Sequence, residues 1–180
     1  DEATSTPAAR AAYTAAAALQ NREAWDLAAE EWASLVATHP ADPLAVKGRY
    51  YLGICQAKRG DWPAAAKAFR DVLGTAADEE TKSLARWELA RGSFQTAQRD
   101  PSPQAYAVAT AALRDFLSHG AGQPQRDEAA FCLGESLWQE GQQESAIAVW
   151  KRFLAEYPSS PRLPDVLYAL GVGQAQIKQP

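Results

Sequence analysis

Apolar and polar positions alternate along the chain in a pattern that returns five times. Each copy begins with an aromatic residue that is followed three positions later by Gly or Ala. The five pairs are Tyr13 and Ala16, Tyr50 and Gly53, Trp87 and Ala90, Phe131 and Gly134, and Tyr168 and Gly171. Successive aromatic residues are 37, 37, 44 and 37 positions apart. A period in this range predicts a helical solenoid, in which each unit buries its apolar face against its neighbours.

A second apolar set follows each of the first four aromatic residues and predicts a second helix in each unit. Trp25, Ala28, Trp32, Leu35 and Val36 fit one stripe of a 3.6-residue period. Alanine occupies the same slot in all four units, at positions 28, 65, 109 and 146. A small side chain there lets the two helices of a unit approach closely. We call the first helix of a unit its A helix and the second its B helix.

Turn and capping residues indicate where several of these helices begin and end. We expect an A helix from Leu44 to Arg59 that stops at Gly60, because glycine suits the left-handed position after a helix. Asp61 is then the cap of the next B helix, with Pro63 in its first turn. Gly141 predicts the same break in the fourth unit. Residues 1–6 are expected to form a polar lead-in. The pairs Thr6-Pro7, Asp42-Pro43 and Ser160-Pro161 predict the starts of the first, second and fifth A helices.

The one irregular step leaves seven extra residues in the third unit, around Asp100 to Pro103. Seven residues are about two helical turns, so the A helix of this unit can lengthen without rotating its buried face before the proline-rich segment ends it. Two interpretations stay open for the insertion. We favour a tolerated lengthening of a surface loop over a dedicated binding loop.

Composition and charge exclude several classes of function. The chain is 47% apolar with a net charge of −4, and its charges are interspersed, so we expect no nucleic-acid partner. No apolar run approaches the length that a bilayer requires. Cys55 and Cys132 lie in predicted helices two units apart, so we expect two buried free thiols. The start at Asp1 without Met fits a removed signal peptide and a piece excised from a larger protein equally well.

The second and fourth units resemble the tetratricopeptide repeat (TPR) family. The matching residues are Tyr50, Leu52, Gly53, Gly60, Asp61, Trp62, Ala65 and Phe69 in the second unit, and Phe131, Leu133, Gly134, Gly141, Ala146, Trp150 and Pro158 in the fourth. The resemblance implies an all-α, right-handed superhelical solenoid of about four helical hairpins plus a lone C-terminal helix. It implies a TPR domain over residues 7–180, with repeats at 7–40, 43–77, 80–121 and 125–158 and a half repeat at 161–179.

A narrower resemblance concerns the linker before the last helix. The segment from Trp150 to Gly171 contains a Tyr-Pro-Ser-Ser-Pro junction followed by an aromatic-x-Leu-Gly helix. This style is similar to bacterial cell-envelope TPR proteins, namely the Tol-Pal-associated cell-division coordinator and the lipoprotein of the β-barrel assembly machinery. The resemblance implies a periplasmic or other cell-envelope location, with a cytoplasmic one left open.

The TPR resemblance also implies where a partner binds, because the A helices of this family line the concave surface. We expect that surface to be basic toward the N-terminal end, aromatic in the middle and acidic toward the C-terminal end. The partner-binding residues are expected to be Tyr13, Lys47, Tyr50, Lys58, Trp87, Arg91, Phe94, Phe131, Glu135, Trp138 and Tyr168. The aromatic residues that begin the five copies form a ladder: Tyr13, Tyr50, Trp87, Phe131 and Tyr168. The alternative is that this aromatic ladder only packs against its neighbours in the stack. We expect Phe94 and Trp138 to form an extra exposed aromatic patch.

These features together favour a non-enzymatic protein–protein interaction scaffold that binds a protein or peptide partner on this face. We expect no cofactor, no metal and no insertion into a membrane. The alternative is a self-assembly module that forms homo-oligomers through the apolar C-terminal helix around Leu170 and Ile177. His39 and His119 fall at the ends of B helices, where they fit capping better than catalysis. No phosphate loop or metal-ligand motif is present in the sequence.

Overall fold

The structure is a computed structural model that describes residues 4–75, 77–119 and 122–177, and within these ranges it contains nine helices and no strand. Two compact units make up the chain, residues 1–89 and 90–180, and the division between them falls inside α5. Part of the predicted lead-in (1–3), the end of the predicted half repeat (178–179) and residues 76 and 120–121 lie outside the described ranges.

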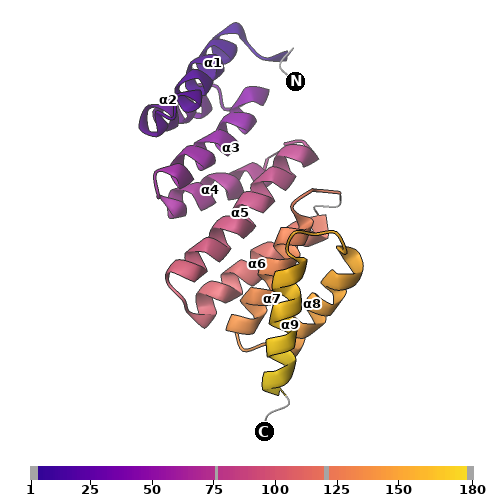
Figure 1. Ribbon diagram of the computed structural model, residues 1–180. Coiled ribbons are helices and arrows are strands. Elements are labelled where there is room, and N and C mark those ends of the chain that lie inside the picture. The colour runs from indigo at the N-terminus through magenta and orange to yellow at the C-terminus, as the bar shows by residue number, and fades with distance from the viewer. Residues whose placement is uncertain (1–3, 76, 120–121, 178–180) are drawn as a thin grey trace. The chain divides into compact units, whose positions relative to one another are not determined.

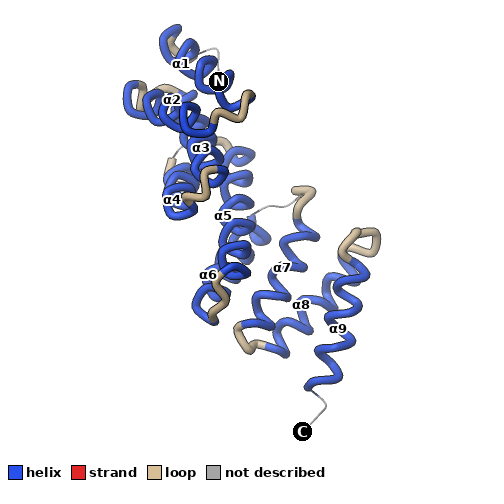
Figure 2. The backbone as a smooth tube through the Cα atoms, turned by 60° about the vertical axis from the view of Figure 1, so that its left-hand side comes forward, coloured by secondary structure: helices blue, strands red, loops and turns tan. Residues whose placement is uncertain are grey.

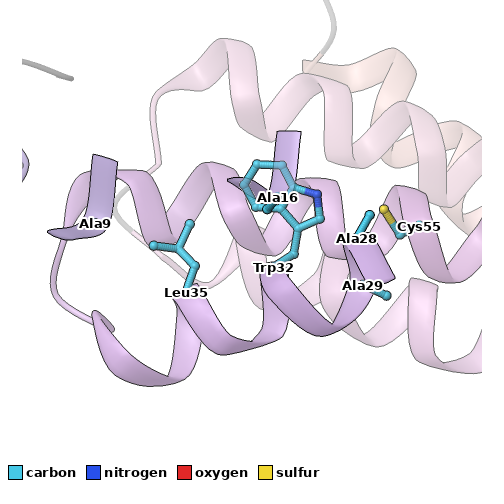
Figure 3. Packing of buried hydrophobic residues seen from close by; sticks show 7 residues of the cluster. All are labelled: Ala9, Ala16, Ala28, Ala29, Trp32, Leu35 and Cys55. Atoms are coloured by element: carbon cyan, nitrogen blue, oxygen red, sulfur yellow. The ribbon is translucent and has the colours of Figure 1, made fainter. Parts of the chain in front are cut away.

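The first unit is a stack of helical hairpins. It contains α1 (Pro7–Asn21), α2 (Trp25–Thr38), α3 (Pro43–Lys58), α4 (Trp62–Leu73) and the first part of α5 (Glu79–Arg99). Here α1 packs against α2, α2 against α3 and α3 against α4 (Figure 1). Trp32 of α2 is buried in the core of this unit, and Ala16 and Ala28 lie beside its ring with no exposed surface (Figure 3). The predicted small residues therefore make room for a large aromatic side chain between the helices.

The second unit repeats the same construction. It holds the rest of α5, then α6 (Pro103–His119), α7 (Arg126–Gln139), α8 (Gln143–Glu156) and α9 (Leu163–Ile177), and α6 to α9 pack in chain order (Figure 2). Trp150 of α8 lies on Gly134 of α7 so closely that a Cβ at this glycine would fall 2.0 Å from the indole nitrogen. The glycine is thus required by the approach of the two helices.

Local sequence signals place several helix ends correctly. The side chains of Thr6, Asp42 and Asp61 cap α1, α3 and α4 by accepting hydrogen bonds from backbone N–H groups at 3.0 to 3.1 Å. Gly60 and Gly141 have φ angles of 83° and 81°, as predicted for residues that follow a helix in the left-handed conformation.

The start of α9 differs from the prediction. The helix begins at Leu163, whereas the Ser160-Pro161 pair predicts a start at Pro161. The Ser160 hydroxyl accepts a hydrogen bond from the backbone N–H of Arg162 at 3.1 Å, and the Ser160 carbonyl accepts one from Leu163 at 3.1 Å. These bonds close a turn around Pro161 and delay the helix by two residues.

The seven extra residues of the third unit are not a loop insertion, so the favoured interpretation is wrong. The connection between α5 and α6 spans residues 100–102, as long as the connection between α3 and α4 at residues 59–61. Instead, both helices of the third unit are longer than those of the second. After its ladder aromatic, Trp87, α5 continues for four residues more than α3 does after Tyr50. At the other side of the turn, α6 begins three residues before Tyr106, whereas α4 begins at the equivalent residue, Trp62. The insertion therefore lengthens both helices by about one turn each.

The remaining global expectations concern membranes and cysteines. None of the described helices combines the length and the apolar character that crossing a bilayer demands. Cys55 and Cys132 are buried free thiols, as predicted. Burial raises the pKa of Cys55 to about 11 and that of Cys132 to about 12, so both thiols are protonated at neutral pH.

Candidate functional site

A pocket of about 240 Å³ opens among the A helices of the first unit. We call it the tyrosine pocket; it is lined by Tyr13, Lys47, Tyr50, Tyr51, Asp78, Glu80, Thr81 and Leu84. Three of these residues, Tyr13, Lys47 and Tyr50, belong to the predicted binding surface, and the fold brings them together from α1 and α3. The other walls come from α5 and the residue before it.

Buried aromatic packing fixes the rings that line the tyrosine pocket. Tyr13 meets Trp32 edge-on with ring centroids 4.9 Å apart, and Tyr51 stacks on the same indole at 5.1 Å. The indole N–H of Trp32 in turn donates to Gln20 at 2.8 Å. Tyr50 completes the row, with its centroid 5.3 Å from Tyr51. All three tyrosines stay partly exposed, so they present rigid, amphipathic faces to the pocket.

The polar side of the pocket carries both signs of charge. Asp78 precedes α5 and accepts hydrogen bonds from the Thr81 N–H at 2.7 Å and from the Thr81 hydroxyl at 3.0 Å. The backbone bond from Thr81 lowers the pKa of Asp78, against a smaller effect of burial, and the charge of Lys47 lowers it further. Glu80 adds a second carboxylate. The expected basic N-terminal end is therefore wrong for this pocket, because Asp78 and Glu80 line it together with Lys47.

Two predicted residues of the first unit lie outside the tyrosine pocket lining. Lys58 is placed over the ring of Trp25, with its Nζ 5.6 Å from the centroid, so it contacts α2. Trp87 lies half-buried on α5. In contrast, Tyr51 lines the pocket although the predicted surface omits it. Tyr51 directly follows Tyr50 in the same helix, and side chains of consecutive helical residues are about 100° apart. The sequence pattern therefore does not predict that both rings line one pocket.

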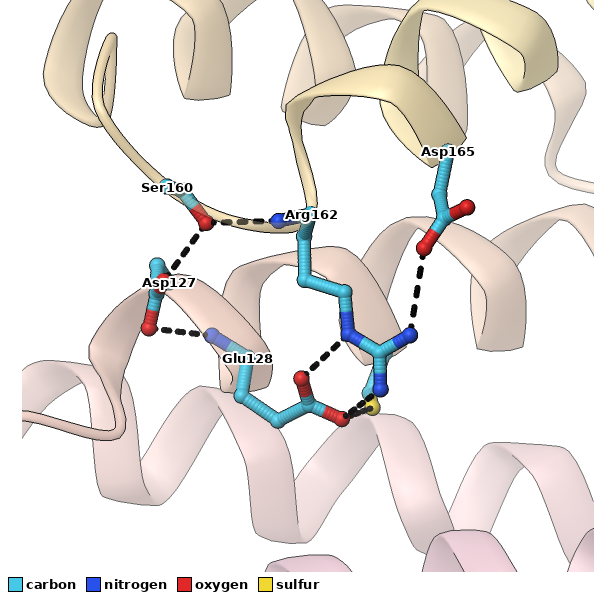
Figure 4. Close-up of polar contacts among 6 residues, drawn as sticks. Asp127, Glu128, Ser160, Arg162 and Asp165 are labelled. Carbon is cyan, nitrogen blue, oxygen red and sulfur yellow. Dashed lines mark hydrogen bonds and ion pairs between the residues drawn. The ribbon is translucent and has the colours of Figure 1, made fainter.

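In the second unit, Arg162 links the turn before α9 to α7 (Figure 4). Its guanidinium donates to both carboxylate oxygens of Glu128, at 2.5 and 2.8 Å, and to Asp165 at 3.1 Å. These hydrogen bonds raise the pKa of Arg162 above its ordinary value. The same guanidinium lies 5.1 Å from the centroid of Phe131, a predicted ladder residue. The predicted partner-binding residues do not include Arg162. The one local sign of its ion pairs in the sequence is the acidic residue Asp165, three positions later.

Of the acidic residues expected toward the C-terminal end, Glu128 and Asp165 pair with Arg162, and Glu135 lies near Asp165. Glu135 lies half-buried on α7, and burial raises its pKa, with the like charge of Asp165 adding to the shift. Arg162 offsets part of this negative charge by pairing with Glu128 and Asp165.

The extra exposed aromatic patch is not formed. Phe94 is only 8% exposed, and Trp138 is half-buried with its ring 5.8 Å from that of Trp150. Trp138 also lies against α9, where a Cβ on Gly173 would come within 3.0 Å of the indole. The expectation of exposure is therefore wrong for Phe94, and Trp138 keeps only part of its surface exposed because Trp150 and α9 pack against its ring. Tyr168, by contrast, is 75% exposed, and Arg91 is half-buried.

The two histidines occupy helix ends, as predicted. His39 is the residue after α2, and His119 is the last residue of α6 with its Nδ1 3.0 Å from the Asp115 carbonyl. Within the described part of the chain, no cluster of His, Cys, Asp and Glu could hold a metal ion.

Comparison with known proteins gives a family and a fold. The family model for the tetratricopeptide repeat matches residues 13–80 and 102–161. Curated protein sequences give no match. A solved structure of a MamA double mutant, RS-1 ArsTM, is 18% identical with a TM-score of 0.74, covering 98% of this chain and 88% of that one.

Two further solved structures agree with this fold. MamA from residue 41 to its end, from Desulfovibrio magneticus RS-1, is 17% identical with a TM-score of 0.72 and covers 96% of this chain and 87% of that one. YrrB, described as a TPR protein with an unusual peptide-binding site, is 15% identical with a TM-score of 0.62 over 93% of this chain and 76% of that one. The predicted all-α TPR solenoid is confirmed.

Proposed function

Because the chain belongs to the tetratricopeptide repeat family, we propose that it is a non-enzymatic scaffold that binds an extended segment of a partner protein along its A helices. The observation that supports this site is the tyrosine pocket. It gathers Tyr13 and Tyr50, which are in phase on successive A helices, together with Lys47 around a hollow that one partner side chain can enter. YrrB, which has the same fold, is described as having a peptide-binding site.

The tyrosine pocket has the chemistry of a peptide-binding site. Its volume of about 240 Å³ accommodates one apolar side chain between the rings. Tyrosine is a residue type that anchors protein interfaces. Since Trp32 already holds Tyr13 and Tyr51 in place, binding loses little side-chain entropy. Lys47 and Glu80 lie at the same pocket and can bind the charged or backbone groups that flank the inserted side chain.

Substitutions at the tyrosine pocket test this proposal. Peptides selected from a random phage-displayed library on the wild-type protein would be titrated against Tyr50→Ala and Lys47→Glu by fluorescence anisotropy. We expect each substitution to weaken binding by about tenfold or more, since it removes an anchor or reverses a charge at the site. Trp87→Ala and Arg91→Glu examine the predicted surface beyond the pocket in the same way.

The control is Arg70→Glu, which changes an exposed side chain on α4 away from the pocket. It should bind the selected peptides as the wild type does. Circular dichroism melting curves show whether each variant keeps its helices, which matters for Tyr50 because its ring packs on Phe69. Selected peptides that bind Lys47→Glu and Tyr50→Ala as tightly as the wild type would contradict the proposal.

A second candidate function, self-assembly through the last helix, is favoured by the exposed apolar side chains of α9. Leu167, Val172 and Ile177 are 52%, 38% and 42% exposed, next to the exposed Tyr168. In the second and fourth hairpins, Gly53 and Gly134 are covered by a ring from the B helix, whereas a Cβ at Gly171 would meet nothing within 4 Å. A second copy of the chain could cover this face.

A location in the bacterial cell envelope remains a proposal that rests on the linker style around Tyr157 and Pro161. Fractionation of cells that express the full-length natural protein would test it, since an envelope protein is recovered with the periplasm or the membranes.

A further inference from the structure

A second pocket, of about 350 Å³, lies in the other unit among α6, α7 and α8. We call it the arginine pocket. Its floor is apolar: Ala130 and Leu133 of α7 are each 7% exposed, and Phe153 of α8 is 1% exposed. Its rim carries one arginine from each helix, Arg114, Arg126 and Arg152. The volume is in the lower part of the range in which protein pockets bind small ligands or single side chains.

The arginine pocket is distinct from the predicted binding surface. Side chains on an α-helix are spaced by about 100°, so Arg126, Ala130 and Leu133 share one side of α7. Glu128, Phe131 and Glu135 lie on roughly the opposite side of the same helix. A ligand in the arginine pocket therefore lies on the side of α7 away from Phe131 and Glu135.

The rim is positive in a protein whose net charge is −4. Glu156 is the one carboxylate in the lining, and it already accepts a hydrogen bond from Arg152 at 2.6 Å. Arg126 is held in place by donating to the Leu117 carbonyl at 2.7 Å. Arg114 has no hydrogen bond or ion pair among the residues that the structure describes and is exposed. Each guanidinium has five N–H donors, so most of the donors at this rim are available to a ligand.

We propose that the arginine pocket binds an acidic, hydrophobic peptide segment of a partner protein. A large apolar side chain of the segment fills the space above Leu133 and Phe153. A neighbouring Asp or Glu side chain pairs with Arg114 and with the outward donors of Arg126, since guanidinium and carboxylate match in geometry and charge. The apolar floor accounts for the hydrophobic side chain of the segment. The excess of three arginines over one glutamate in the lining accounts for its acidic side chain.

Three synthetic peptides separate the two requirements. Ac-Glu-Leu-Phe-Glu-NH2 carries both features, Ac-Gln-Leu-Phe-Gln-NH2 lacks the charge, and Ac-Glu-Ala-Ala-Glu-NH2 lacks the large apolar side chains. Each is titrated into the protein while methyl NMR signals of Leu117, Leu133 and Val149, all in the lining, are recorded. We expect saturating shifts of these signals with the first peptide, and binding that is weaker by roughly fivefold or more with each of the others.

Arg114→Gln is the test variant, because it removes one charge at the rim without touching the buried floor. It should weaken the binding of the acidic peptide by roughly fivefold. The matched control is Arg70→Gln, an exposed arginine on α4 in the other unit, which should leave binding unchanged. Tyr50→Ala should also leave it unchanged, so failure of this proposal and failure of the tyrosine-pocket proposal are distinguishable.

Three outcomes would overturn the proposal. The first is an absence of saturating methyl shifts with the acidic peptide. The second is equal affinity for the acidic and amide peptides, or for wild type and Arg114→Gln. The third is that inorganic phosphate or 3-phenylpropionate binds as tightly as the peptide, which would assign the pocket to small anions instead of a polypeptide.

Discussion

At the scale of single residues, two tryptophans in the same slot have different surroundings. Trp32 and Trp150 are each almost fully buried on the B helix of their hairpin. The Trp32 N–H donates to Gln20, four residues after the small residue Ala16. The equivalent position after Gly134 is Trp138, whose ring packs at a tilt against Trp150 and offers no acceptor. The Trp150 N–H has no hydrogen-bond partner within the described ranges.

This difference predicts unequal costs for the same substitution. Trp32→Phe should lower the free energy of unfolding by about 1–3 kcal/mol more than Trp150→Phe. The first loses the hydrogen bond of a buried indole and leaves the Gln20 side-chain oxygen with only the weak Cys55 thiol as a donor, whereas the second removes a donor that is already unsatisfied. Urea unfolding followed by circular dichroism measures both, and each variant serves as the control for the ring volume lost in the other. Equal losses would contradict this account of the two N–H groups.

At the scale of elements, one carboxylate joins the starts of two A helices. Asp42 caps α3 by accepting from the Leu44 N–H at 3.0 Å, and it also accepts from the Thr6 N–H at the start of α1 at 2.9 Å. The backbone hydrogen bond from Thr6 is the largest cause of the fall in the pKa of Asp42 to about 2, from an ordinary value of 3.8. The ionised carboxylate is therefore the form that stabilises this contact.

The lowered pKa predicts how stability depends on pH. Because the folded-state pKa lies below the unfolded one, Asp42 contributes its full stabilisation above pH 3.8 and loses it as the pH falls toward 2. Thermal melts of the wild type and Asp42→Asn should thus differ most near neutral pH and converge across this window. Asp61→Asn is the control, since Asp61 caps α4 alone. A difference between wild type and Asp42→Asn that stays constant down to pH 2 would contradict the assignment.

At the scale of the whole molecule, the exposed face of α9 predicts a homodimer. We expect light scattering to give a dimer for the wild type and a monomer for Leu167→Glu, because a charge cannot be buried at low cost in an apolar interface. Val108→Glu is the matched control, since Val108 is 62% exposed on α6. Leu170 is unsuitable for this test because it is 6% exposed and lies in the core. A wild type that stays monomeric at its highest soluble concentration would remove the self-assembly candidate.

The lengthened hairpin of α5 and α6 shows the limit of sequence reasoning about insertions. The sequence predicts that seven residues are added and that the segment around Pro101 ends a helix. It does not predict how the seven divide between the two helices, because either helix can gain residues at its free end without disturbing its buried stripe.

The sequence alone determines the helices, their order and the family. These depend on local physics: a 3.6-residue apolar period, caps such as Thr6 and Asp42, and glycines such as Gly60 that adopt a left-handed conformation. All of these interactions act between residues a few positions apart along the chain, so they can be predicted from the sequence alone.

Only the tertiary structure decides the site. It places Tyr51 in the tyrosine pocket, sets Asp78 near Lys47, buries Phe94 and joins Arg162 to Glu128 across 34 positions of sequence. Each of these outcomes depends on how one helix is rotated against the next and on charges supplied by another helix. A repeat pattern predicts that successive helices pack, but rotations of a few tens of degrees decide which side chains meet.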